Sequence, residues 1–329
     1  MKSNFYLYQS GILRRQDDSI VFETKDNKHY LPIQQIDHLF VFGQVEFNQN
    51  VMKLLFEYGI CIFLFTYQGK FLGKFLPYQE KLGEHLIRQV QFTTDENARI
   101  KVARLILKGS VGNMLFVLKY YEKKGRIEEK VIQLIEDLIE SINDSQSVEA
   151  LRMIEAQVKK IYYACFDMIL LSNLFRFEQR STYPPKNEVN AMMSFGYALL
   201  YSRLESTLHR SRLCVELPFV HGHSQKGSGL QHDIADIFKP IFVDRVIFRM
   251  INKKQLDLKS DFESQKGGVY LSKDGMTKFI YEFDQVLLDT IKIGERTYSF
   301  RQILSREVHN ISRHVHEGKP YVPFVLTRW

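Results

Sequence analysis

The sequence predicts an α+β protein in which a small strand-rich region precedes a larger helical one. Before about residue 80, short runs of β-branched and aromatic residues alternate with turn-forming residues. From about residue 82 onwards, apolar residues recur with the period of an α-helix. A hydrophobic content of 45% in 329 residues is ample for large cores. We therefore expect an N-terminal β domain over residues 1–80 and an all-α domain over residues 81–329.

The N-terminal region is expected to contain a sheet and one helix. Four runs have the composition of strands, at residues 5–8, 20–22, 39–42 and 60–65. Between residues 48 and 58 the spacing changes, because Val51, Leu54 and Leu55 fall on one face of a helix. This pattern predicts a helix that packs on the sheet.

The C-terminal region is expected to be a succession of helices. Helical periodicity covers residues 82–91, 94–122, 127–143, 147–175, 187–210, 230–250, 277–292 and 298–316. Prolines fall at the joints, and Pro240 is expected to end or bend the helix over 230–250. A short extended stretch is expected at residues 269–271.

The cysteine content indicates a reducing compartment, and the charge is compatible with a polyanionic partner. The chain has 45 Lys and Arg against 38 Asp and Glu, a balance of +7 that suits nucleic acid but is common among unrelated proteins. Its three cysteines lie far apart in apolar sequence, which predicts buried thiols. The most apolar run contains Asp167 and is too short to span a bilayer, and the first residues lack the pattern of a signal peptide. We expect a cytoplasmic protein without a membrane association.

The most informative motif is a histidine followed by two carboxylates. His221 ends a Pro-Phe-Val-His sequence, and Asp233 and Asp236 follow in a predicted helix. Residues three apart share a helix face, with Cβ atoms about 5–6 Å apart. Two such carboxylates repel each other unless a cation lies between them. If the turn at 225–229 folds His221 over this face, the three side chains supply the nitrogen and oxygen ligands that divalent metals use.

Glu155 is a further acidic candidate, because it borders the apolar stripe that Leu151 and Val158 form on the helix over 147–175. Considered alone, each candidate has a simpler interpretation. Glu155 would be a solvated or ion-paired residue, and His221 a hydrogen-bonded structural histidine. Asp233 and Asp236 would face solvent.

Taken together, these residues resemble the CRISPR-associated integrase family, whose members are the larger, metal-dependent subunit of the spacer-acquisition machinery. The motifs that carry the resemblance are, in order, Ile154-Glu155-Ala156 with Tyr162-Tyr163, the Asn-rich segment 184–191 with 194–200, Phe219-Val220-His221, and 233–240 followed by 243–245. The resemblance covers nearly the whole chain. A β domain before an α domain is also the architecture of this family.

The resemblance implies Glu155, His221 and Asp236 as metal ligands, with Asp233 as an extra ligand or a partner of the ligands. The implied cation is Mg²⁺ or Mn²⁺, which suits an imidazole with carboxylates better than a closed zinc site does. The chain departs from the commoner family pattern before the histidine, at residues 214–218, and in having Asp236 where Glu is frequent. His223 and His232 compete for the role of His221, which we favour because it directly follows the Phe-Val pair.

Basic and amide side chains near these motifs are candidates for nucleic-acid contacts. They are Arg88, Lys108, Asn190, Lys239 and Arg245. Basic side chains bind phosphates through charge. An ordinary solvated helix surface explains the basic residues equally well.

The predicted function is metal-dependent DNA endonuclease and strand-transferase activity, which inserts short DNA fragments into a CRISPR repeat array. A 3′-hydroxyl attacks a phosphodiester, and a hard cation stabilises the charge that develops on its oxygens. The alternatives are a repair-type nuclease acting on branched DNA and a noncatalytic DNA-bridging scaffold. The resemblance also implies double-stranded DNA, a homodimer and a small ferredoxin-like adaptation subunit as partners. Edge strands of the β domain are natural places for dimer pairing.

Overall fold

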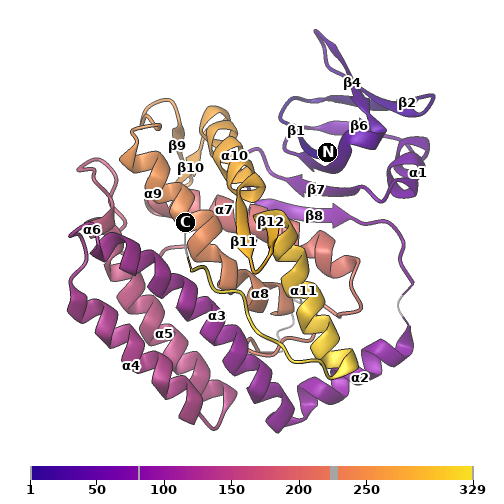
Figure 1. The fold of residues 1–329 in the computed structure, drawn as a ribbon. Helices are drawn as coiled ribbons and strands as arrows, with labels where there is room; N and C mark the ends of the chain where they lie inside the picture. The colour runs from indigo at the N-terminus through magenta and orange to yellow at the C-terminus, as the bar shows by residue number, and fades with distance from the viewer. Residues whose placement is uncertain (1, 81, 223–228, 328–329) are drawn as a thin grey trace.

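Two four-stranded sheets lie beside a helical body in the computed structural model of the chain (Figure 1). The structure describes residues 2–80, 82–222 and 229–327. The first sheet has the order β1 (Ser3–Leu7), β5 (Ile36–Val41), β7 (Cys61–Phe65) and β8 (Phe71–Phe75). The second sheet has the order β4 (Lys28–Pro32), β3 (Ser19–Glu23), β2 (Gly11–Gln16) and β6 (Val45–Phe47). The predicted helix is α1 (Gln49–Glu57), which Asn48 caps by accepting a hydrogen bond from the backbone N–H of Val51.

The central strands β5 and β7 of the first sheet are buried on both faces, which explains their continuous apolar runs. On β5, Leu39 and Val41 pack in a cluster with α1 and the second sheet. Phe40, between them, points to the opposite face and joins the apolar cluster of the helical region, as does Phe63 on β7. The two regions therefore share a core. The domain boundary near residue 80 stays a prediction, and residue 81 lies outside the described residues.

The C-terminal region is largely helical, as predicted. Its helices are α2 (Gly83–Thr94), α3 (Glu96–Glu122), α4 (Glu129–Asp144), α5 (Val148–Ala164), α6 (Phe166–Ile169), α7 (Glu188–His209), α8 (Gly229–Lys239), α9 (Arg245–Asn252), α10 (Lys273–Leu288) and α11 (Phe300–Glu317). Within the described residues, no helix combines the length and the apolar character needed to cross a membrane.

The expectation of an all-α region was wrong in detail, because two β-hairpins interrupt the helices. The first pairs β9 (Phe262–Gln265) with β10 (Gly268–Leu271), where an extended stretch was predicted. The second pairs β11 (Thr290–Ile293) with β12 (Arg296–Ser299). The helix predicted over 277–292 therefore ends at Leu288, and Gly294 turns the hairpin with a φ of 60°. The strands β2, β4, β6 and β8 were also not predicted.

Two predicted helices are shorter than expected. The helix over 147–175 ends at Ala164, and only the single turn α6 follows. The carboxylate of Asp167 accepts a hydrogen bond of 2.7 Å from the backbone N–H of Phe177, which folds the chain back on itself. The helix over 230–250 is divided as expected at Pro240, where the missing N–H interrupts the α-helical ladder. The chain stays helical there, because Pro240–Asp244 forms a π-helical turn before α9.

Helix α3 lies at the centre of the helical region and contacts α4, α5 and α8 (Figure 1). Its buried Asn113 joins three segments. The side-chain amide donates to the carbonyl oxygens of Ile237 at 2.7 Å and Phe324 at 3.1 Å, and its oxygen accepts from the backbone N–H of Leu326 at 2.8 Å. The segment that follows α11 is thus fastened to α8 through this side chain.

Replacing Asn113 with alanine is expected to lower the free energy of unfolding by about 2–5 kcal/mol. The change leaves three backbone groups without their partner, and a buried polar group without a partner costs about 1–3 kcal/mol. Urea denaturation of the parent and the variant measures the difference. The matched control is Asn97→Ala on the same helix, because Asn97 is exposed. An equal loss in both variants would contradict this role of Asn113.

Candidate active site

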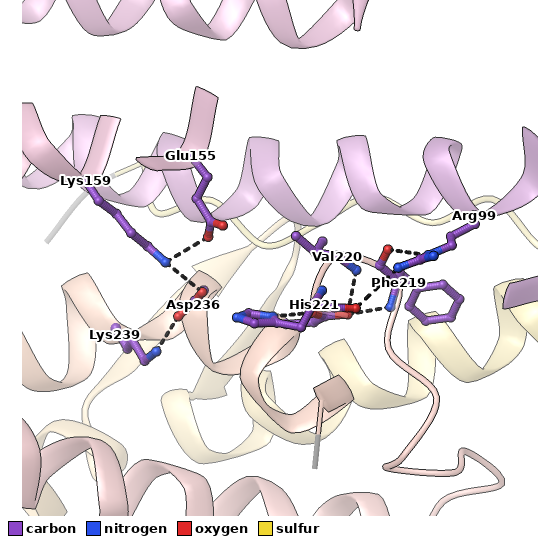
Figure 2. A network of polar contacts seen from close by, with 9 residues as sticks. Arg99, Glu155, Lys159, Phe219, Val220, His221, Asp236 and Lys239 are labelled. Atoms are coloured by element: carbon purple, nitrogen blue, oxygen red, sulfur yellow. Dashed lines mark hydrogen bonds and ion pairs between the residues drawn. The ribbon is translucent and has the colours of Figure 1, made fainter. Parts of the chain in front are cut away.

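A carboxylate on α8 organises the turn that carries His221. Asp233 is 1% exposed, and its Oδ2 accepts hydrogen bonds from the backbone N–H groups of Phe219 at 2.6 Å and Val220 at 3.0 Å. Its Oδ1 accepts from the backbone N–H of His221 at 2.9 Å and lies 2.6 Å from His221 Nδ1. Asp233 therefore fixes both the backbone and the imidazole ring of His221. Figure 2 shows the free end of this ring extending toward Asp236.

Arg99 on α3 holds the same turn from the other side. Its Nε donates to the carbonyl oxygen of Phe219 at 2.9 Å, and its Nη2 donates to that of His221 at 3.3 Å. The backbone N–H groups of the turn thus bind a carboxylate while its carbonyl groups bind a guanidinium. This arrangement makes the position of His221 depend on both α3 and α8 (Figure 2).

Two lysines separate and neutralise the two buried carboxylates Glu155 and Asp236. The Nζ of Lys159 lies 2.9 Å from Glu155 Oε1 and 3.0 Å from Asp236 Oδ2, so that one ammonium group bridges both (Figure 2). Lys239 binds the other oxygen of Asp236. Its ammonium also lies over the rings of Tyr197 and Tyr201, at 4.9 and 5.1 Å from their centroids.

The electrostatics of the cluster follow from burial and from these ammonium groups. Burial raises the pKa of Glu155, and the negative charge of Asp236 raises it further. Burial acts in the same direction on Asp236, but Lys159 and Lys239 outweigh it and the pKa of Asp236 is lowered. For His221, burial lowers the pKa, yet the hydrogen bond and charge of Asp233 outweigh burial and raise it. Asp236 is therefore ionised at neutral pH.

The predicted residues Glu155, His221, Asp233 and Asp236 thus come together from α5, α8 and the turn before α8. Asp236 and Glu155 both pair with the ammonium group of Lys159, and Asp233 forms a hydrogen bond with His221. Among residues 2–80, 82–222 and 229–327, no three His, Cys, Asp or Glu side chains lie close enough together to hold a metal ion. The carboxylate oxygens that a cation would take are bound to Lys159 and Lys239 in this structure.

The competing histidines differ from His221. The ring of His232 lies 5.7 Å from that of His221 and packs edge-on against Tyr201 at 4.6 Å, and burial together with Lys239 lowers its pKa to about 4. No carboxylate contact of His232 matches the bond between His221 and Asp233 within the described part of the chain. His223 and most of the predicted turn at 225–229 lie outside the described residues.

The five residues predicted to contact nucleic acid do not form one cluster, and their neighbours differ. Arg88 binds Glu84 at 2.7 Å and the carbonyl oxygen of His316, while Lys108 donates to the side chain of Asn143. Arg245 is partly exposed and lines a cavity that Arg249 of α9 and Lys124, Arg126 and Lys253 also line. Lys239 belongs to the acidic cluster described above.

Asn190 is placed differently from the other four candidates. It is fully buried, and its amide group holds the preceding segment by donating to the carbonyl oxygen of Gln179 at 2.8 Å. Its Oδ1 accepts from Arg180 at 2.8 Å and from the backbone N–H of Ser181 at 2.9 Å. This bonding gives Asn190 a structural role inside the chain, so we do not propose it as a DNA contact.

Sequence reasoning missed two residues of the cluster. Lys159 stands four residues after Glu155, a spacing that predicts a helical ion pair, but its second partner Asp236 is 77 positions away. Arg99 binds carbonyl groups of residues more than 100 positions further along the chain, and no local sequence pattern predicts such a contact.

Comparison with known proteins gives full-length matches. A family model described as CRISPR associated protein Cas1 matches residues 5–285. The CRISPR-associated endonuclease Cas1 2 of Thermodesulfovibrio yellowstonii is 32% identical over an alignment that covers 100% of both chains. The CRISPR-associated endonuclease Cas1 of Haloferax volcanii is also 32% identical, over 97% of each chain.

Solved structures agree with these matches. A Cas1 protein from Thermotoga maritima is 28% identical and superimposes with a TM-score of 0.86, covering 95% of this chain and 97% of its own. A casposase bound to an integration product, at 16% identity and a TM-score of 0.84, covers 99% of this chain and 93% of its own. A chain of a Cas6-RT-Cas1–Cas2 complex, at 18% identity and a TM-score of 0.81, covers 97% of this chain and 35% of its own. The last two show likeness of fold alone. The match to the family model and to full-length relatives shows that this chain belongs to the Cas1 family of CRISPR-associated proteins.

Proposed function

We propose that this protein is a metal-dependent DNA endonuclease and strand transferase. In this proposal it joins the 3′-hydroxyl of a short DNA fragment to a CRISPR repeat array. Family membership supports the proposal, since full-length relatives carry the name CRISPR-associated endonuclease. The fold shared with a casposase whose solved complex contains an integration product is consistent with strand transfer.

The observation that carries the proposal is the convergence of Glu155 and Asp236 on one cation. The ammonium of Lys159 lies within 3.0 Å of an oxygen of each carboxylate. Two buried carboxylates that converge in this way repel each other unless a positive charge lies between them. We infer that a divalent cation would bind between these carboxylates, at the position that the ammonium of Lys159 takes in this structure.

The donor set fits Mg²⁺ or Mn²⁺. Glu155 and Asp236 would supply carboxylate oxygens, and His221 would supply Nε2, since Asp233 occupies Nδ1. A carboxylate behind a ligating imidazole fixes the ring and its tautomer, which is the role we propose for Asp233. When bound, the cation supplies electrostatic stabilisation of a phosphodiester that is gaining negative charge.

Other residues of the chain would keep the ligands charged, hold the site in position and bind DNA. Lys159 and Lys239 keep Asp236 ionised at neutral pH, which is the form in which a carboxylate can ligate a cation. Arg99 and Asp233 hold the turn that presents His221, and thereby limit its movement during the reaction. Arg88, Lys108 and Arg245 are proposed to contact DNA phosphates through charge.

We also propose that the protein works as a homodimer with a small ferredoxin-like adaptation subunit. The likeness of fold to a chain of a Cas1–Cas2 complex is consistent with such a partner. The net charge of +7 is compatible with the double-stranded DNA that we propose as the substrate.

The test is the joining of a short DNA duplex with 3′-hydroxyl ends to a plasmid that carries the repeat, with Mg²⁺ or Mn²⁺ and with the small subunit present or absent. We expect joined product with the parent, its loss on addition of EDTA, and a fall of about 100-fold or more with His221→Ala. His221→Ala should still bind DNA in a mobility-shift assay. It should also keep its fold, because Asp233 retains its backbone donors.

His232→Gln is the matched control, since it changes the neighbouring histidine and should preserve joining. Cleavage of branched DNA without joining under either cation would favour a repair-type nuclease. Joining by His221→Ala at the parent rate would instead favour a noncatalytic scaffold whose partner carries out the chemistry.

A further inference from the structure

The ammonium group of Lys159 lies at the point where the two buried carboxylates of the candidate active site converge. Lys159 and Glu155 stand about one turn apart on α5, and both side chains extend toward Asp236 on α8 (Figure 2). The Nζ of Lys159 lies 2.9 Å from Glu155 Oε1 and 3.0 Å from Asp236 Oδ2. Lys159 is therefore a positive charge that the chain itself places between two of the proposed metal ligands.

Lys159 and Lys239 both bind Asp236, but they are held differently. The ammonium of Lys239 pairs with Asp236 Oδ1 and also lies over two tyrosine rings, at 4.9 and 5.1 Å from their centroids. Aromatic faces attract a cation, so these rings help to retain Lys239. In the described part of the chain, the ion-pair partners of Lys159 are Glu155 and Asp236 alone. The position of the Lys159 ammonium therefore depends on the two carboxylates.

The side chain of Lys159 borders solvent, unlike the carboxylates that it joins. It is 26% exposed, against 11% for the side chain of Glu155 and 3% for that of Asp236. A lysine has a flexible four-carbon stem and a strongly hydrated ammonium group. The ammonium can therefore move from the carboxylates into water while the backbone of α5 keeps its place.

A divalent cation and the Lys159 ammonium exclude each other from this position. Both oxygens of Asp236 are bound to ammonium groups, Oδ2 to Lys159 and Oδ1 to Lys239. Two positive charges at one point repel each other strongly in a buried site. While Lys159 is in place, the two ionised carboxylates and the two lysines balance in charge. When the ammonium moves away, one negative charge is in excess, and this charge attracts a cation.

We propose that Lys159 is an internal competitor of the divalent cation, which stabilises Glu155 and Asp236 before a metal binds and moves away when one binds. This inference rests on the function proposed above, because it concerns the same metal site. The apparent affinity for the cation is then reduced by the fraction of molecules in which the position is open. The lysine would thus hold the two carboxylates together without a metal, and would set the cation concentration at which the site fills.

The first test is titration of the full chain with Mn²⁺ alone, followed by calorimetry and by the electron paramagnetic resonance signal of the free ion. Lys159→Met removes the charge and keeps an unbranched side chain. We expect this variant to bind Mn²⁺ at least about tenfold more tightly than the parent. Lys160→Met is the matched control, because Lys160 is the next residue of α5 and is exposed. Its charge is screened by solvent, so its loss should change the affinity by less than about twofold.

Thermal unfolding in EDTA tests the stabilising role of Lys159. Lys159→Met should melt about 3 °C or more below the parent, because two buried carboxylates then repel each other with no ammonium between them. Adding Glu155→Gln should recover part of this loss, since one of the repelling charges is removed. Saturating Mn²⁺ should raise the melting temperature of Lys159→Met more than that of the parent. A lysine with a purely structural role would give equal rises.

Lys159→Gln is a second, milder variant, because its amide keeps N–H donors for the carboxylates without the charge. It should also bind Mn²⁺ more tightly than the parent. Binding by the parent that His221→Ala weakens, together with parent affinity or weaker binding in both Lys159 variants, would overturn this inference and leave the proposed metal site intact. No saturable Mn²⁺ binding by the parent or by either variant would overturn the metal site, and this inference with it.

Discussion

Replacing Asp236 with alanine is expected to bring strand transfer below detection, the largest loss of activity among the substitutions considered. Asp236 is 2% exposed and binds both Lys159 and Lys239. Its removal leaves two ammonium groups facing one remaining carboxylate, so the cluster changes from neutral to positive. A cation is then repelled from the position that the proposed reaction needs. The measurement is joined product per hour in saturating Mn²⁺.

The same substitution is expected to destabilise the fold, which requires a control. Breaking a buried ion pair by removing one partner costs about 3–5 kcal/mol, because the other charge stays buried. Asp236→Asn keeps the shape and a hydrogen-bond acceptor, so it should unfold nearer to the parent while losing joining just as fully. Substantial joining by Asp236→Asn would contradict a role for the charge.

The architecture was predictable from the sequence because its signals are local. Runs such as residues 39–42 and 60–65 are apolar on both faces, and the structure places them in β5 and β7, the central strands of a sheet, which are buried on both sides. The hairpin of β11 and β12 was missed, and only β10 of the first hairpin was predicted, because each strand has only four residues and because β10 and β11 adjoin the strongly periodic helix α10. The end of α5 was misplaced because Asp167 folds the chain through bonds to residues ten positions later, which no periodicity records.

The sequence predicted only those site residues whose type and spacing are typical of metal ligands. The three-residue spacing of Asp233 and Asp236 indicates that both lie on one side of α8, and the structure gives them different partners, His221 for one and two lysines for the other. Which partner each aspartate has depends on how α5 and the turn before α8 pack against α8. The difference between the two aspartates therefore comes from tertiary packing.

Asp244 links the candidate site to the stability of the helical core. It ends the π-helical turn that follows α8, and it is 1% exposed. Its carboxylate accepts hydrogen bonds from Tyr162 of α5 at 3.1 Å and from Tyr197 of α7 at 2.9 Å. Since α5 also carries Glu155 and Lys159, this contact sets the distance between the helices that form the acidic cluster.

Replacing Asp244 with leucine is therefore expected to lower the free energy of unfolding by about 2–6 kcal/mol. Two buried phenol groups lose their acceptor, and each costs about 1–3 kcal/mol. Urea denaturation at pH 5 measures the loss. Adding Tyr162→Phe and Tyr197→Phe to the Asp244→Leu variant should recover part of it, because replacing both partners by apolar groups removes the unpaired hydroxyls.

The pH dependence of stability gives a separate prediction for the same residue. Burial raises the pKa of Asp244 to about 7, although the hydroxyls of Tyr197 and Tyr162 act in the opposite direction. The carboxyl group of an unfolded chain titrates near pH 4. Between about pH 4 and pH 7 the folded state therefore holds more protons than the unfolded state, so stability falls as the pH rises through this window. The effect is at most about 4 kcal/mol.

Asp244→Asn keeps an acceptor for the two tyrosines and cannot ionise. It should match the parent at pH 5 within about 1 kcal/mol and exceed it at pH 8, when free energies of unfolding are compared across this range. The variant should still lose some stability as the pH rises, because burial also raises the pKa of Glu307 to about 7. The decisive quantity is the difference in slope between parent and variant. Equal slopes would mean that Asp244 is already ionised at pH 5, and that its two tyrosines stabilise the charged form more strongly than burial opposes it.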